Sequence, residues 1–116
     1  MKKIISLLVC ILMLTACGND YKTIDSNEAM DLINNEAIVI DVRSNDEYDT
    51  GHIEGSINIP VDNINSVNYN KDTTIIVYCA TGMRSSNAAE TLISLGYTNV
   101  YNLDGGLINW GFELED

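Results

Sequence analysis

The stretch "TTIIVYCATGMRSSNAAETLISLG", residues 73–96, decides the fold of this chain. It opens with an apolar run over 73–78 whose β-branched residues are typical of a strand buried on both faces. Apolar and small residues then recur on one helical stripe over 84–95, before Gly96 ends the helix: Ala88, Ala89, Leu92 and Leu95. A buried strand followed at once by an amphipathic helix predicts one unit of an α/β fold.

The rest of the chain repeats this alternation. We expect strands over 21–24, 37–40, 56–59, 73–78 and 99–103, helical segments after an N-cap at Asp25 or Ser26, around 46–48, over 84–95 and over 107–110, and a turn over 51–55. This order predicts a three-layer α/β fold, with a mostly parallel central sheet of about five strands and helices on both faces. Ligands of such sheets bind outside the carboxyl ends of the strands, and Cys79 follows one of these ends.

Cys79 begins a loop that can hold an anion. Successive backbone N–H groups of a strand-to-helix loop point into one concavity, and the helix N-terminus adds about half a positive charge. Gly82 permits the turn, and Arg84 supplies a permanent cation with a planar fork of donors. A sulfur in such a loop is favoured as the thiolate, which is the nucleophile, so we interpret Cys79 as reactive rather than as a buried structural thiol.

The seven residues 79–85, CATGMRS, resemble the active-site loop of the rhodanese (thiosulfate sulfurtransferase) family. Three further stretches agree with that family. DVR over 41–43 resembles its "DVR", GHIEGSINIP over 51–60 resembles its "GHIxGAxNIP", and LDGG over 103–106 with Trp110 resembles its closing motif. Four motifs in the family's order are a specific signal, whereas a lone C-x4-R would be a weak one.

The resemblance implies a single rhodanese-like domain over 21–116 that needs no cofactor. Cys79 would take a sulfane sulfur from a small donor such as thiosulfate, polysulfide or a persulfide, hold it as a persulfide, and pass it to a thiol or cyanide-like acceptor. Arg84 would assist, and the anion would be held by the backbone amides of the loop: Ala80, Thr81, Gly82, Met83 and Ser85. Met83 stands where many members have a charged or polar residue, which leaves polysulfide or a protein persulfide as alternatives to thiosulfate.

Two other functions stay open at this point. The domain could act as a surface-anchored module for redox sensing or protein interaction, without turnover. An arsenate or phosphate-ester enzyme is a weaker alternative, because the related phosphatase-type loops have C-x5-R, one residue longer than the C-x4-R of this chain.

The remaining polar residues of the motifs are interpreted mainly as scaffold. Asp41 and Arg43 could support the site from behind, and Arg43 has the i, i+4 spacing of a helix-surface ion pair with Glu47. His52 could form a dyad with the cysteine, but it lies in a turn motif, so we expect it to support the fold. One histidine and one free cysteine cannot build a metal site.

The first twenty residues predict export and a lipid anchor. Two lysines precede an apolar run over 4–14, which is the layout of a secretory signal and is short for a membrane span. The sequence LTAC over 14–17 resembles the lipobox of bacterial lipoproteins, which implies cleavage after residue 16 and lipid on Cys17. We therefore expect a signal peptide over 1–16, a lipidated N-terminus with a short tether over 17–20, and a membrane-anchored protein on the extracytoplasmic side.

The mature chain would be strongly acidic. Removal of residues 1–16 takes away two lysines and no acid, which changes the formal net charge from −11 to −13. Such a surface argues against nucleic acid as a partner and against electrostatic binding to anionic lipid, so we expect the acyl chains to provide the anchoring. We expect a monomer that is held to the membrane by its lipid.

Replacement of Cys17 tests the anchor. The Cys17→Ser protein is expected to leave the membrane fraction or to accumulate unprocessed, because nothing else in so acidic a chain holds it to the bilayer. Membrane fractionation and the mass of the N-terminal peptide measure both effects. A Cys17→Ser protein that is cut at the same bond and stays membrane-bound would rule out the lipobox.

Overall fold

The structure is a computed structural model that describes residues 20–116. The predicted signal peptide and Cys17 lie outside these residues. Within them, no helix combines the length and apolar character that a membrane crossing needs.

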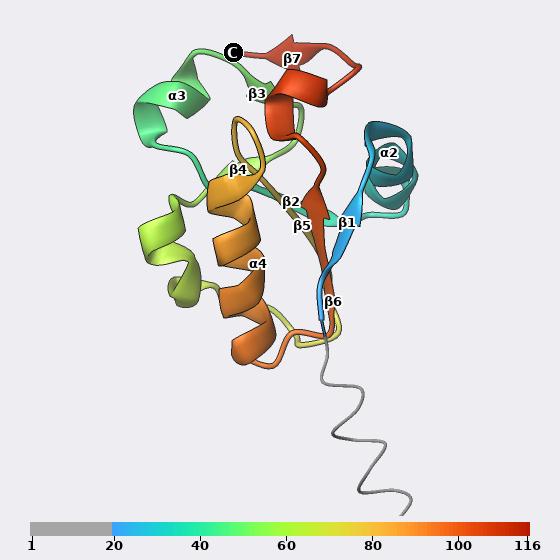
Figure 1. Cartoon of the computed structure of the whole chain (residues 1–116), viewed down its shortest axis with the longest axis vertical. Helices are drawn as coiled ribbons and strands as arrows, with labels where there is room; N and C mark the ends of the chain where they lie inside the picture. The colour runs from blue at the N-terminus through green and yellow to red at the C-terminus, as the bar shows by residue number, and fades with distance from the viewer. Residues whose placement is uncertain (1–19) are drawn as a thin grey trace, which may run out of the picture.

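A five-stranded parallel sheet forms the centre of the domain (Figure 1). Its strand order is β1-β6-β5-β2-β4, and every neighbouring pair is parallel. The bounds are Lys22–Ile24 for β1, Ile38–Asp41 for β2, Ile57–Asn58 for β4, Thr74–Tyr78 for β5 and Asn99–Leu103 for β6. Each of the five predicted strands is present, within one or two residues of its expected ends, and the predicted sheet is confirmed.

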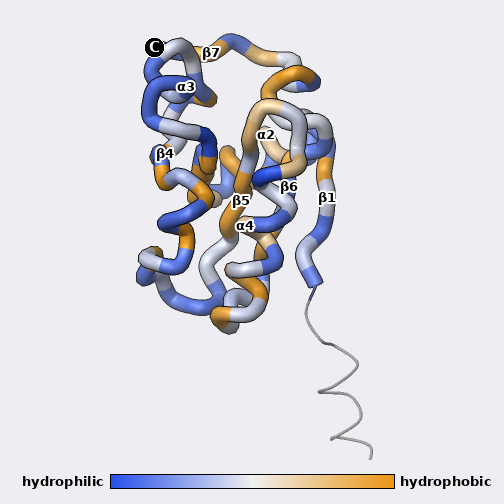
Figure 2. The backbone as a smooth tube through the Cα atoms, turned by 60° about the vertical axis from the view of Figure 1, so that its left-hand side comes forward, coloured by the Kyte–Doolittle hydropathy of each residue, from blue (hydrophilic) through white to orange (hydrophobic). Residues whose placement is uncertain are grey.

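Helices cover both faces of the sheet, as predicted. On one side lie α4 (Met83–Ser94) and the 3-10 helix η1 (Val61–Ser66), and on the other lies α2 (Ser26–Asn34), as Figure 1 shows. The side chains of β5 alternate between the two cores: Ile75 and Val77 pack towards α4, and Ile76 and Tyr78 pack towards α2. This two-sided burial explains the unbroken apolar run of β5, which lies in the middle of the domain in Figure 2.

Two short helices begin with capping boxes. Asp25 caps α2 and exchanges hydrogen bonds with Glu28, and Ser44 caps α3 (Asn45–Asp49) in the same way with Glu47. Each box satisfies backbone N–H groups that have no partner inside the helix. The box at Ser44 fixes the carboxylate of Glu47 at the N-terminal end of α3.

The structure differs from the sequence prediction in three places. Part of the expected turn over 51–55 forms a strand, β3 (His52–Ile53), which pairs antiparallel with β7 (Leu114–Glu115). The 3-10 helix η1 was not predicted, and Leu95, expected on the buried stripe of α4, is 37% exposed because it caps the end of that helix. Strands of two residues are too short to show a period, which is why β3 and β7 escape pattern analysis.

Candidate active site

The loop that follows β5 lies at the carboxyl edge of the sheet. Cys79 comes directly after β5, and the loop enters α4 at Met83. A second 3-10 helix, η2 (Gly106–Asn109), closes over this loop: Leu107 N–H donates to the Cys79 carbonyl (3.0 Å) and Ile108 N–H to the Ala80 carbonyl (3.2 Å). A side chain at Gly106 would overlap the backbone of Cys79 and Ala80, so the closing Gly-Gly motif packs directly against the loop.

The sulfur of Cys79 accepts hydrogen bonds from the loop. The backbone N–H groups of Gly82 and Ser85 lie 3.1 Å and 3.4 Å from Sγ, and the hydroxyl oxygen of Ser85 lies 3.5 Å away. Gly82 is the N-cap of α4 and has φ of 104°, a left-handed conformation that glycine adopts without strain. The sulfur therefore sits at the N-terminal end of a 12-residue helix, where the helix dipole favours negative charge.

These contacts lower the pKa of the Cys79 thiol. Burial opposes ionisation and by itself raises the pKa, since the residue is only 1% exposed. The hydrogen bond of the Ser85 hydroxyl and those of the backbone N–H groups of Ser85, Thr81 and Gly82 outweigh burial, and the pKa falls below its ordinary value. Of the loop amides that were expected to hold an anion, those of Gly82 and Ser85 thus point at the sulfur and form its cradle.

Asn102 is a part of the site that the sequence analysis missed. It lies on β6, is 5% exposed, and its Oδ1 accepts from the Ser85 hydroxyl at 2.5 Å, while its Nδ2 lies 3.4 Å from the Gly82 carbonyl. Asn102 thereby connects the two ends of the cradle. A polar side chain near the end of a buried strand was the available signal, but the sequence gives no sign that β6 lies beside β5.

Arg84 faces a carboxylate. Its NH1 and NH2 nitrogens donate to the two carboxylate oxygens of Glu47 at 2.8 Å and 3.1 Å, and both side chains are about two-fifths exposed. This hydrogen bond is the main reason that the pKa of Glu47 falls to about 2. The predicted ion pair between Arg43 and Glu47 is therefore wrong, because Glu47 pairs with the arginine of the loop.

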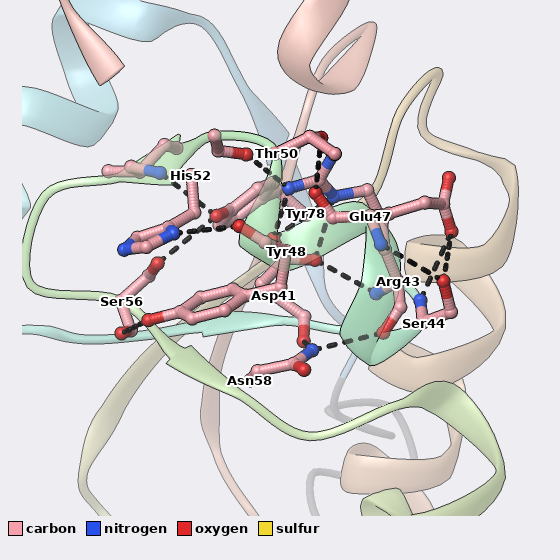
Figure 3. A network of polar contacts seen from close by, with 12 residues as sticks. Asp41, Arg43, Ser44, Glu47, Tyr48, Thr50, His52, Ser56, Asn58 and Tyr78 are labelled. Carbon is pink, nitrogen blue, oxygen red and sulfur yellow. Dashed lines mark hydrogen bonds and ion pairs between the residues drawn. The ribbon is translucent and has the colours of Figure 1, made fainter. Parts of the chain in front are cut away.

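Arg43 instead forms a buried fork with Asp41. Its Nε and NH2 groups donate to the Asp41 carboxylate at 2.7–3.0 Å, and NH2 also donates to the Gly51 carbonyl at 2.7 Å (Figure 3). Asn58 donates to the carbonyls of Asp41 and Arg43 and ties β4 to this network. The pair orders the chain between β2 and β3, which fits the predicted role as scaffold behind the site.

His52 and Trp110 also serve the fold. The His52 ring stacks on Tyr48 with centroids 3.7 Å apart, its Nδ1 bonds the Tyr48 carbonyl at 2.9 Å, and its Nε2 lies 3.4 Å from Glu115 (Figure 3 shows the first two residues). Both ring nitrogens are thus engaged away from Cys79. Trp110 packs against the core cluster on the α2 side of the sheet.

The other predicted loop residues line the rim. Thr81 is exposed, Ala80 is partly buried, and Met83 is 75% exposed at the start of α4. Residues 20–116 contain no group of three side chains that could hold a metal ion.

Comparison with known proteins decides the family. A family described as "Rhodanese-like domain" matches residues 25–113, which includes every element of the central sheet except β1. The chain belongs to the rhodanese-like family. Its Cys79 loop, the stretch over 41–43 and the closing glycines over 105–106 carry the sequence motifs that resemble this family.

Relatives of this rhodanese-like chain include sulfurtransferases. The thiosulfate sulfurtransferase GlpE of Pseudomonas fluorescens is 36% identical over 96 residues, which are 79% of this chain and 86% of that protein. A rhodanese-related protein of Thermoplasma volcanium is similar in structure, with a TM-score of 0.73 and 31% identity over 82% of this chain and 98% of its own. The human single-domain sulfurtransferase TSTD1 has a TM-score of 0.72 and 27% identity over 78% of this chain and 96% of its own.

Removal of the Ser85 hydroxyl tests the cradle. In Ser85→Ala the pKa of Cys79 is expected to rise. Beside the neutral thiol the Ser85 hydroxyl donates to Asn102, but it can turn towards Sγ once the thiol is ionised, and the variant loses this donor. The rate of alkylation of Cys79 by iodoacetamide, followed across pH by mass spectrometry of its peptide, measures this pKa. The midpoint should move to higher pH while the rate at high pH stays the same.

Ser86→Ala is the matched control, since the Ser86 hydroxyl donates to the Met83 carbonyl and not to the sulfur. It should keep the wild-type midpoint. An unchanged midpoint in Ser85→Ala would show that the hydroxyl does not stabilise the thiolate.

Proposed function

We propose that this rhodanese-like protein moves sulfane sulfur from a donor to a thiophilic acceptor through a persulfide on Cys79. The observation that carries the proposal is a buried sulfur held by two backbone N–H groups at the start of α4. Membership of the family and the sulfurtransferases among the relatives support it.

In the first step the Cys79 thiolate attacks the outer sulfur of the donor. With thiosulfate, a Cys79–sulfur bond forms, the S–S bond of thiosulfate breaks, and its electron pair leaves with sulfite. The enzyme then carries R–S–S⁻, and the total charge is unchanged. The loop amides favour this anion for the same reason that they favour the thiolate.

In the second step a thiol or cyanide-like acceptor attacks the terminal sulfur of the persulfide. The new acceptor–sulfur bond forms as the Cys79 S–S bond breaks, and the thiolate is regenerated. No external oxidant or reductant is needed. The hydrogen bonds that lower the pKa of Cys79 make its thiolate a better leaving group in this step.

The lipid on Cys17 belongs to the same proposal. Anchoring would place sulfur transfer on the extracytoplasmic face of the membrane, where the donor would be a soluble sulfane compound or a persulfide on another protein. A module for sensing or interaction would keep the fold but would not regenerate its thiolate by transfer.

Mass spectrometry after incubation with a donor tests the proposal. The peptide that contains Cys79 is expected to gain one sulfur atom with thiosulfate or polysulfide and to lose it when cyanide is added. Cys79→Ser should neither gain sulfur nor produce thiocyanate, because a hydroxyl stays protonated and is a poor nucleophile.

Ser86→Ala, which changes an exposed hydroxyl on the same helix, should load like the wild type. Residual turnover in Cys79→Ser would exclude Cys79 as the carrier. A wild-type protein that gains sulfur but never releases it would favour the sensing module over the enzyme.

A further inference from the structure

The cations beside the Cys79 loop are both paired with carboxylates. Residues 20–116 contain four cationic side chains, and two of them, Lys22 and Lys71, lie at the amino-terminal ends of β1 and β5, away from the loop. Arg43 is held by Asp41 at 2.7 Å, and Arg84 is held by Glu47 at 2.8 Å. In this part of the chain, the carboxyl edge of the sheet thus carries two neutral pairs.

The pair between Glu47 and Arg84 is fixed by more than mutual attraction. Glu47 Oε1 also accepts from the backbone N–H and the hydroxyl of Ser44, each at 3.1 Å, because Glu47 completes the capping box of α3. The capping box of α3 therefore sets the position of the Glu47 carboxylate independently of Arg84. A pKa of about 2 keeps it charged throughout the range in which Cys79 can react.

An incoming anion therefore contacts backbone amides at the sulfur. At the rim of the site it finds Arg84, whose charge is neutralised by Glu47. Amides stabilise one negative charge at short range, whereas a second charge on the donor would need a free cation. From these contacts we infer that Glu47 sets the charge preference of the site, so that sulfur donors with one negative charge are favoured over dianions. The inference rests on the proposed sulfur transfer only for the identity of the donor.

Two donors that differ by one charge test the preference. Thiosulfate is a dianion and methanethiosulfonate is a monoanion, and both give the Cys79 persulfide by the same S–S cleavage, with sulfite or methanesulfinate as the leaving group. The measured quantity is kcat/KM for thiosulfate divided by kcat/KM for methanethiosulfonate. Removal of one carboxylate charge near the reacting sulfur should raise this ratio by about two- to fivefold.

Four variants of the full chain assign the effect. Glu47→Gln, which can still cap α3, should raise the ratio. Arg84→Gln should lower it, because Glu47 is then unpaired. The double variant should return within about twofold of the wild type, since the two substitutions cancel in charge. Asp46→Asn removes an exposed charge from the same helix and should change the ratio less than Glu47→Gln does.

Alkylation of Cys79 measures the same effect of charge near the sulfur, and it requires no sulfur transfer. Iodoacetate and iodoacetamide differ by one negative charge, so the ratio of their rates should follow the same order across the variants. If the variants show this order but no persulfide forms, the proposed function is wrong and the role of Glu47 is still supported.

The inference is overturned if Glu47→Gln changes the two reagents equally, which a merely structural role predicts. It is also overturned if the double variant fails to restore the ratio, because Glu47 would then not act through Arg84.

Discussion

A cysteine sulfur held by backbone N–H groups in a buried position is the constraint on which this structure depends. Burial raises the pKa of a thiol, so ionisation requires donors at fixed positions. The chain supplies them by ending a central strand at Tyr78 and starting α4 at Met83. The left-handed Gly82 turns the amides towards Sγ, and the close packing of Gly106 holds the loop from the other side. A change in the conformation of any of these segments would alter the hydrogen bonds to Sγ.

The fold and the position of the Cys79 loop could be predicted from the sequence because their signals are local. The β-branched run of β5 and the glycine after Cys79 each report a conformation of their own segment. The long-range contacts could not be predicted. The helical spacing of Arg43 and Glu47 indicated an ion pair between them. In the structure, Arg43 instead pairs with the Asp41 carboxylate, and Glu47 pairs with the Arg84 guanidinium. Asn102 was missed because nothing in the sequence places β6 next to the loop.

In the structure, the groups that stabilise the sulfur are not the charged groups at the rim of the site. Arg84 was expected to assist the bound anion, but its two NH groups are engaged by Glu47, and the donors on the sulfur are the backbone N–H groups of Gly82 and Ser85. Fixed amides stabilise one charge without side-chain rearrangement, whereas the neutral pair at the rim adds no attraction for a second charge. In a chain with a formal net charge of −11, the distant carboxylates act in the same direction as this pair.

The most direct measurement of the central claim is the pKa of Cys79 in the Glu47→Gln/Arg84→Gln double variant, obtained from the pH dependence of its alkylation. This variant removes the ion pair and leaves the amides of Gly82 and Ser85 and the Ser85 hydroxyl in place. The pKa is predicted to stay below that of an ordinary thiol, close to the wild-type value, because the loop holds the thiolate. A rise to the ordinary value would contradict the account and would show that Arg84, and not the backbone, stabilises the anion.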